Sequence, residues 1–316
     1  MSALFILAGL VLLVLGGEAL VRGATGLAKA FGVSPLLIGL VVVGFGTSTP
    51  ELTTSVTASL AGSPDVAVGN VIGSNIANIL LILAATALLA PIAVNADAFR
   101  RDGPALALAS IVAAAAIWFL PLGRLVGLVL VALLLAYVVI SYVVDRRTHD
   151  AGAALHEAEA ASVPAPGRGL AVVYFLIGLV GVVGGARLLV DGATDLALAV
   201  GISEAVIGLT IVAVGTSLPE LAASLSAARK GEGDIAFGNV VGSNIFNALF
   251  ILGGAALVAP FELAPGAFGL DLLVMLGAAA LLVVFALTGK KITRVEGAIL
   301  LALYVAYMAW LGLGAA

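Results

Sequence analysis

Long apolar segments recur along the whole chain, separated by short stretches that contain glycine, proline and charged residues. Each segment has about the 20 residues that a helix needs to cross the hydrocarbon core of a bilayer. The pattern therefore predicts an all-α polytopic membrane protein with ten transmembrane helices. We expect these helices near residues 3–27, 36–60, 66–89, 103–120, 124–144, 169–197, 205–228, 235–258, 267–287 and 295–313. The first is interpreted as a membrane helix and not a signal peptide, because no positive leading segment precedes it.

Composition agrees with this interpretation and excludes several classes of protein. Hydrophobic residues make up 62% of the 316 residues and charged residues only 10%, against about 25% charged in a soluble domain. No basic cluster suits nucleic acid, and no sequence feature indicates a protein partner. The chain has no cysteine, which rules out disulfides, thiolate metal sites and cysteine nucleophiles.

Two halves of the chain repeat one another. A shift of 169 residues aligns 23–80 with 192–249 without a gap, and 32 of the 58 positions are identical. We therefore expect a first repeat at 1–144, a polar cytoplasmic linker at 145–168 and a second repeat at 169–316. Five helices per repeat is an odd number, so the second repeat must enter the membrane from the opposite side. The halves are thus predicted to be inverted repeats.

The distribution of basic residues predicts the orientation. Cytoplasmic loops carry an excess of Lys and Arg. Of the 14 basic residues, only Arg124 and Arg187 fall on one side of the predicted membrane, and 12 fall on the other. Both termini are therefore expected outside the cytoplasm, in a protein of the plasma (cell inner) membrane.

Polar residues interrupt two apolar segments in each repeat, at matching positions. The first repeat has G-F-G-T-S-T-P-E at 44–51 and G-S-N-I-A-N at 73–78, and the second has A-V-G-T-S-L-P-E at 213–220 and G-S-N-I-F-N at 242–247. Residues three or four apart share one face of a helix. The groups expected to converge are Thr47, Ser48, Glu51, Ser74 and Asn78, and Thr216, Ser217, Glu220, Ser243 and Asn247. If the halves face each other, these oxygens form one cage.

Proline and charge strengthen the case for an ion site. Pro50 and Pro219 have no amide hydrogen, so carbonyl oxygens one turn earlier are freed to bind a ligand. Glu51 and Glu220 would each cost about 2.5–3.5 kcal/mol at mid-bilayer, and no Lys or Arg lies deep in a predicted helix to compensate them. Oxygen ligands favour Ca²⁺ and Na⁺ over zinc or copper. A bound cation is the expected counter-charge.

These paired motifs resemble those of the sodium/calcium exchanger family, and the resemblance covers nearly the whole chain. It implies two inverted five-helix units in which helices 2, 3, 7 and 8 enclose the ions and helices 1 and 6 slide against them. It also implies electrogenic Na⁺ uptake coupled to Ca²⁺ export, with Ca²⁺ and Na⁺ as partners in a lipid bilayer. The ten residues above are the implied ligands, together with backbone carbonyls near Gly44 and Ala213. No cofactor, no catalytic residue and no enzymatic activity are expected.

One position departs from part of the family. Several prokaryotic relatives and the potassium-dependent branch have aspartate where this chain has Asn247, so the cage would contain two carboxylates and not three. That argues against K⁺ co-transport. The proton/calcium branch usually has glutamate where Asn78 and Asn247 stand, and H⁺/Ca²⁺ antiport is the alternative.

Other readings remain open for the same residues. One alternative is a cation channel, which would need a continuous pore. Another is an intramembrane hydrolase with Ser48 or Ser217 as nucleophile, but no histidine or lysine is expected at membrane depth to act as its base. Either glutamate could be a protonated structural acid. We expect four further asparagines, Asn70, Asn75, Asn239 and Asn244, to bond between helices, and Asp65 and Asp234 to be helix caps.

Overall fold

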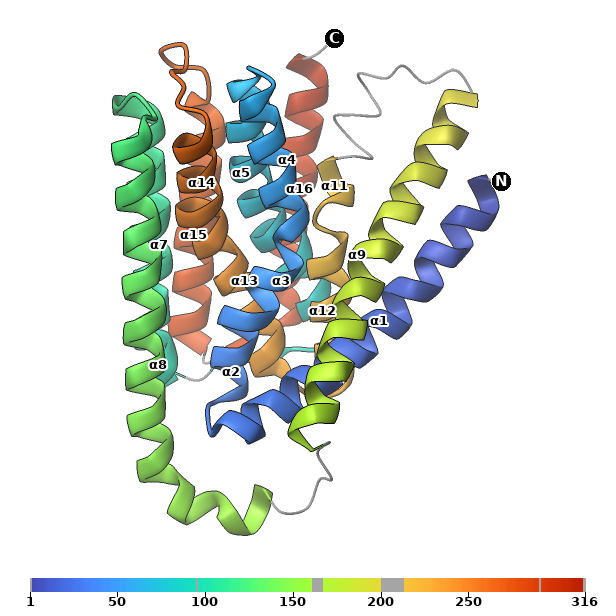
Figure 1. Cartoon of the computed structure of the whole chain (residues 1–316), viewed down its shortest axis with the longest axis vertical. Helices are drawn as coiled ribbons and strands as arrows, with labels where there is room; N and C mark the ends of the chain where they lie inside the picture. The colour runs from blue at the N-terminus through green and yellow to red at the C-terminus, as the bar shows by residue number, and fades with distance from the viewer. Residues whose placement is uncertain (1, 95, 161–166, 200–212, 290, 315–316) are drawn as a thin grey trace. The chain divides into compact units, whose positions relative to one another are not determined.

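The computed structural model describes residues 2–94, 96–160, 167–199, 213–289 and 291–314, and nearly all of them are helical (Figure 1). Within these ranges eight helices are long and apolar enough to cross a membrane, or nine if Pro35–Thr47 and Thr49–Leu60 form one interrupted span. The expected segment 205–228 begins outside the described residues. The helical membrane fold is confirmed, whereas the count of ten remains a prediction.

The chain divides into two compact units that do not coincide with the sequence repeats. The first unit contains Met1–Thr47 and Leu135–Gly242, and the second contains Ser48–Leu134 and Ser243–Ala316. Two of the boundaries fall inside the polar motifs, between Thr47 and Ser48 and between Gly242 and Ser243. Each unit therefore combines chain from both repeats.

The first unit is built around two long helices, α1 (Ser2–Phe31) and α9 (Arg168–Ala199), which lie side by side (Figure 1). Its other elements are α2 (Pro35–Leu37), the π-helix η1 (Ile38–Val43), α3 (Gly44–Thr47), the later part of α8 (Arg124–Ala160), α11 (Ala213–Gly215), α12 (Leu218–Arg229) and the start of α13 (Gly233–Phe246). An apolar core that includes Leu20, Phe175 and Ile235 joins α1, α9 and α13.

Glycines let α1 and α9 approach backbone to backbone. A Cβ atom on Gly23 would lie 2.3 Å from the amide nitrogen of Phe175, and one on Gly9 would lie 2.7 Å from the carbonyl oxygen of Gly185. Early residues of α1 thus meet late residues of α9, so the two helices are antiparallel. They are also equivalent in the sequence, because Gly9, Gly16 and Gly23 align with Gly178, Gly185 and Gly192.

The second unit contains the remaining helices and two very short strands. Its elements are α4 (Thr49–Leu60), α5 (Pro64–Ala77), η2 (Asn78–Leu83), α6 (Ala84–Leu89), β1 (Ile92–Ala93), α7 (Ala96–Phe119), the start of α8, η4 (Asn247–Ile251), α14 (Leu252–Val258), α15 (Gly269–Gly289), β2 (Lys291–Ile292) and α16 (Arg294–Gly314). α4 packs against α5, α14 and η4, while α15 packs on α7 and α16 on α6.

Short strand pairings link the two repeats within the second unit. β1 pairs antiparallel with β2, with Ile92 opposite Ile292, and an isolated antiparallel bridge joins Leu122 to Phe261. Phe261 is the repeat equivalent of Ile92. Each pairing therefore connects the end of the third expected segment of one repeat to the start of the fifth segment of the other.

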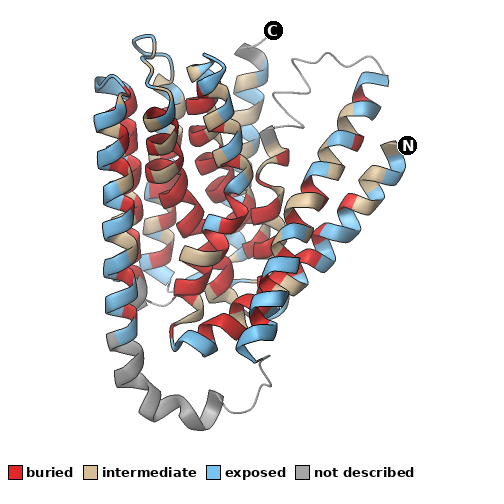
Figure 2. Ribbon diagram, viewed as in Figure 1, coloured by how far each residue is buried: buried red, intermediate tan, exposed pale blue. Residues whose placement is uncertain are grey.

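Exposed apolar side chains cover the outer helices. α8 is mostly exposed down to Arg146 (Figure 2), and Leu125, Leu128 and Val139 on it are 58–75% exposed. Large apolar side chains on an outer surface are expected where lipid tails are the solvent. The exposure pattern is that of a membrane protein.

The start of the expected polar linker differs from the prediction. α8 was expected to end near residue 144 but continues to Ala160. Asp145, placed by the sequence in a solvated linker, is only 5% exposed. Its carboxylate accepts hydrogen bonds from the backbone amide (2.8 Å) and the hydroxyl (2.5 Å) of Ser34, and that hydroxyl also caps α2. A partner far away in the sequence explains the burial.

Candidate functional site

The polar motifs break two helices at equivalent points. α3 ends at Thr47 and α4 begins at Thr49, and the intervening Ser48 has φ −80° and ψ 8°. Ser217, its repeat equivalent, has φ −91° and ψ 5° between α11 and α12. These values lie in the sparsely populated region between helix and strand, where many active-site residues are found. Pro50 and Pro219 therefore sit in the first turn of a new helix, where proline is tolerated, and do not kink a continuous one.

In the second unit, the structure brings together helices that carry residues of both repeats. Glu51 lies in the first turn of α4, Ser74 lies on α5, and Asn78 begins η2. Ser243 lies near the end of α13 and Asn247 begins η4. α4 and α5 both pack against η4. All five side chains, and Ser48 with them, are buried, with exposures of 4% or less.

Two equivalent asparagines in this group have buried amide atoms without a hydrogen-bond partner in the described part of the chain. Asn78 Oδ1, and both Oδ1 and Nδ2 of Asn247, have no hydrogen-bond partner among the described residues. Such groups are rare in folded proteins, because each costs about 1–3 kcal/mol when left unsatisfied. Their repetition at positions 78 and 247 argues for a ligand or water that both contact.

In the first unit, a threonine hydroxyl and an asparagine form a small polar network. Thr47 Oγ1 is fully buried and lies 3.0 Å from the carbonyl oxygen of Val43 and 3.2 Å from Asn239 Oδ1. A hydroxyl that donates its hydrogen to one of these acceptors keeps oxygen lone pairs for a cation. Gly44, one turn before Thr47, is buried as well.

The same asparagine contact occurs in both repeats. Asn239 Nδ2 donates to the carbonyl oxygen of Glu220 (3.2 Å) and to Ser224 Oγ (2.9 Å). Asn70 Nδ2 donates to the carbonyl oxygen of Glu51 (3.0 Å) and to the equivalent Ser55 Oγ (2.9 Å). The expectation that Asn70 and Asn239 bond between helices is confirmed. Each fixes the backbone of the glutamate that starts the facing helix.

The other predicted residues of the first unit lie beside this network. Glu220 in the first turn of α12 is fully buried, Ser217 is 3% exposed, and Thr216 is half-buried. Ala213 begins α11, and its side chain is outside the described residues. The first unit thus gathers Gly44, Thr47, Ser217 and Glu220.

Sequence reasoning missed the π-helices. η2 and η4 begin at Asn78 and Asn247, and η1 ends immediately before Gly44. A π-helical turn adds a residue and changes the face to which a side chain points, and such turns are frequent at functional sites. No residue pattern in these apolar stretches marks the extra residue in advance.

The expectation that Asp65 and Asp234 are N-caps is wrong. Both lie inside the first turn of their helices, α5 and α13, and Ser63 occupies the N-cap of α5. A carboxylate in the first turn still interacts favourably with the helix dipole.

The donor set is that of a hard-cation site. Carboxylate, hydroxyl and amide oxygens dominate, and in the part of the chain that the structure describes no three His, Cys, Asp or Glu side chains are placed so that they could hold a metal ion together. Such oxygens suit Na⁺ and Ca²⁺, which accept neutral oxygen ligands. The twelve predicted residues form two groups, one in each unit, and their union in a single cage stays a prediction.

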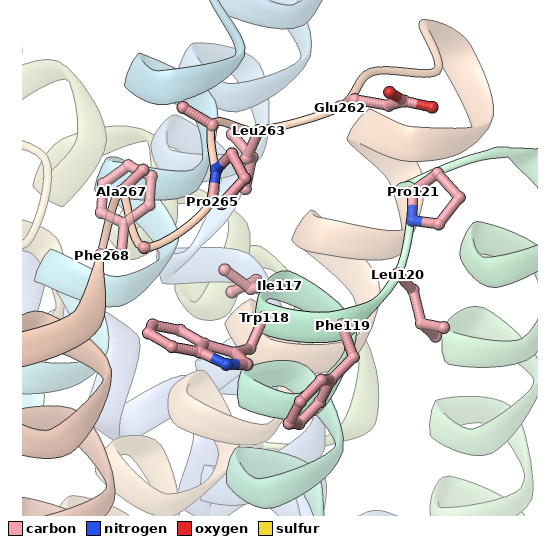
Figure 3. Close-up of a pocket in the computed structure, with 12 residues that line it drawn as sticks. Ile117, Trp118, Phe119, Leu120, Pro121, Glu262, Leu263, Pro265, Ala267 and Phe268 are labelled. Atoms are coloured by element: carbon pink, nitrogen blue, oxygen red, sulfur yellow. The ribbon is translucent and has the colours of Figure 1, made fainter.

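A separate pocket contains none of these residues. This cavity of about 230 Å³ is lined by residues 117–121 and 262–268 of the second unit (Figure 3). Trp118 and Phe119 contribute their rings, and Glu262 is its one acidic residue. A single exposed carboxylate does not resemble the oxygen-rich groups above, so we do not assign ion binding to this pocket.

The fold is that of a helical membrane protein, and its oxygen groups are candidate ligands for hard cations. The model of the family described as "Sodium/calcium exchanger protein" matches residues 1–143 and again 170–313. The chain therefore belongs to the sodium/calcium exchanger family. The two matched ranges closely follow the predicted repeats.

Individual relatives agree with this assignment. The chain is 41% identical to the inner membrane protein YrbG of Escherichia coli over 279 residues, covering 87% of this chain and 86% of the relative. It is 34% identical to the sodium/calcium exchanger MaX1 of Methanosarcina acetivorans, covering 96% and 97%. A solved structure of the sodium-calcium exchanger NCX_Mj, soaked with zero Na⁺ and Ca²⁺, aligns with a TM-score of 0.85 and 35% identity over 98% of each chain.

Proposed function

We propose that this protein exchanges Na⁺ for Ca²⁺ across the membrane by alternating access to one oxygen-lined site. The observation that carries the proposal is the pair of buried, unsatisfied amides of Asn78 and Asn247, which begin equivalent π-helices. Family membership and the likeness to NCX_Mj support the choice of ions.

The ligands of the proposed site come from both repeats. They are Thr47, Ser48, Glu51, Ser74, Asn78, Thr216, Ser217, Glu220, Ser243 and Asn247, with carbonyl oxygens near Gly44 and Ala213.

Charge explains why the two ions compete and why transport is coupled. With two glutamates the empty site is doubly negative. One Ca²⁺ neutralises it, and the three Na⁺ that the family resemblance implies would leave it with one positive charge, which makes the exchange electrogenic. Moving an uncompensated charge through a closed, poorly solvated state is expensive. The protein is therefore expected to change between its two conformations when ions are bound and not when the site is empty. Movement of one ion then requires movement of the other in the opposite direction.

The inverted ten-helix arrangement is part of this proposal. Antiparallel packing of the sequence-equivalent helices α1 and α9 supports it, as do the equivalent strand pairings in the second unit. Inverted repeats give a transporter two related conformations, one open to each side.

The test is Na⁺-dependent ⁴⁵Ca²⁺ flux in proteoliposomes. Glu51→Gln and Glu220→Gln should each abolish this flux. Each substitution removes one of the two negative charges that balance the bound cation and keeps the shape of the side chain. Glu262→Gln, which alters the exposed carboxylate of the pocket in Figure 3, is the matched control and should transport normally. Near-normal flux in either Glu51→Gln or Glu220→Gln would refute the proposal. Ca²⁺ movement driven by a pH gradient alone would favour H⁺/Ca²⁺ antiport.

Orientation can be tested directly because the chain has no cysteine. We propose a location in the plasma (inner) membrane with both termini extracytoplasmic. A single cysteine at Ser2 should then react with a membrane-impermeant maleimide in intact cells. Reaction only after lysis would reverse the orientation.

A further inference from the structure

We propose that the first unit contains a binding site for one anionic phospholipid, separate from the ion ligands. The site is an apolar groove with a volume of about 210 Å³. Its walls are formed by α1, α2, η1 and α8, through the side chains of Phe31, Val33, Leu37, Ile38, Val41, Val42, Val138 and Tyr142. The proposal does not depend on the exchange activity.

The groove has the chemistry of an acyl-chain site. Every lining side chain is apolar except for the hydroxyl of Tyr142. Phe31 and Tyr142 on its walls are 46% and 42% exposed, so the groove opens to the surroundings of the helices. In a bilayer those surroundings are lipid tails, which can enter a groove of this composition without desolvating any polar group.

Two arginines are held against the walls of this groove. The guanidinium of Arg168 lies 4.8 Å from the ring centroid of Phe31, as in a cation–π contact. Arg146 Nη1 donates to the hydroxyl of Tyr142 at 3.0 Å. Both aromatic partners line the groove, so both positive charges lie at its margin, and guanidinium groups bind phosphate well.

The neighbouring acidic group does not cancel both charges. Asp145, next to Arg146 in the chain, accepts two hydrogen bonds from Ser34 and is 5% exposed. One carboxylate offsets at most one of the two arginine charges, and Lys29 in the last turn of α1 adds a further positive charge near Phe31, so the margin of the groove stays positive. A phosphodiester headgroup without an ammonium supplies one negative charge, which is the reason for choosing an anionic over a zwitterionic lipid. Basic clusters between helices on the cytoplasmic side typically bind such headgroups, and both arginines are predicted to lie on that side.

The proposed lipid would contact the helix that leads into the first polar motif. Ile38, Val41 and Val42 of the groove belong to η1, which leads into Gly44 and Thr47. An acyl chain would therefore contact the π-helix immediately before the candidate ion ligands.

The proposal can be tested by native mass spectrometry of the purified full-length protein, titrated with phosphatidylglycerol or phosphatidylethanolamine in detergent. The wild-type protein should bind phosphatidylglycerol preferentially. The Arg146→Gln/Arg168→Gln double variant should bind it about thirtyfold more weakly, from about one kcal/mol for each arginine. Arg229→Gln removes an exposed arginine from the same predicted side, at the end of α12, and should bind as the wild type does.

A second variant addresses the groove and not the charge. Val138→Phe places a ring in the acyl-chain path and should weaken phosphatidylglycerol binding while both arginines remain. Equal binding of the two lipids by the wild type, or unchanged phosphatidylglycerol binding in the double variant, would overturn the proposal. So would an equal loss in Arg229→Gln, since that would indicate an unspecific charge effect.

Discussion

The contact between α13 and η1 gives a sharp prediction about a single methyl group. A Cβ atom on Gly242 would lie 2.0 Å from the carbonyl oxygen of Leu40 and 2.7 Å from its Cα. Real Cβ atoms essentially never lie closer than 3.0 Å to such an atom, so the two backbones would have to separate by about 1 Å at this point. Both neighbours are backbone atoms, and no change of side-chain rotamer can relieve them.

Gly242→Ala should therefore destabilise the protein. Overpacking of this kind typically costs about 1–3 kcal/mol. The displacement would also pull η1 away from α13 and lengthen the 3.2 Å contact between Thr47 and Asn239. The expected results are a lower apparent midpoint of thermal unfolding, followed by tryptophan fluorescence in detergent, and weaker Na⁺-dependent Ca²⁺ flux.

The first repeat supplies the matched control. Gly73 is the equivalent of Gly242, yet nothing lies within 4 Å of a Cβ added there. Gly73→Ala should leave stability unchanged or raise it by up to about 1 kcal/mol, because alanine is the better helix former. Equal losses in the two variants would show that close packing at Gly242 is not the cause, and the reasoning would be wrong.

Two further predictions concern other contacts. Asp145→Asn keeps the shape but removes the charge that Ser34 binds, and should lower the unfolding free energy by about 1–2 kcal/mol, with the exposed Asp191→Asn unchanged as control. If urea or thermal unfolding does not separate the two variants, the buried contact is not stabilising. Asn247→Asp adds a third carboxylate to the proposed site and should tighten Ca²⁺ binding, measured by calorimetry at neutral pH. Unchanged or weaker affinity would exclude Asn247 from the ligands.

Much of the architecture follows from patterns that are local in the sequence. The apolar segments identify the spanning helices because a bilayer requires about 20 apolar residues in succession. The break at Ser48 and Ser217 is also local, because proline and glycine disfavour a continuous helix on both sides of the hydroxyl pair. Polar residues that occur at equivalent positions of both repeats are also distinguished, within this one chain, from polar residues that occur by chance.

Features that depend on distant partners could not be predicted in this way. Asp145 follows an apolar segment and precedes charged residues, so the sequence alone indicates a surface residue. Its burial depends on the hydrogen bonds from Ser34, which is far away in the sequence. The π-turns at Asn78 and Asn247 likewise arise where helices pack, and their residue composition is ordinary for membrane helices. The division into units that cut across the repeats has no sequence signal at all.

That division has a consequence for biosynthesis. During translation, residues 1–47 of the first unit are synthesised first, followed by residues 48–134 of the second unit. Residues 135–242 of the first unit come next, and residues 243–316 of the second unit come last. Neither unit can be completed while only the N-terminal repeat has emerged, so α4 and α5 must wait in the membrane for η4 and α14. The nascent protein should therefore depend on the insertion machinery, or on bound lipid, to shield its buried glutamate until translation is nearly over.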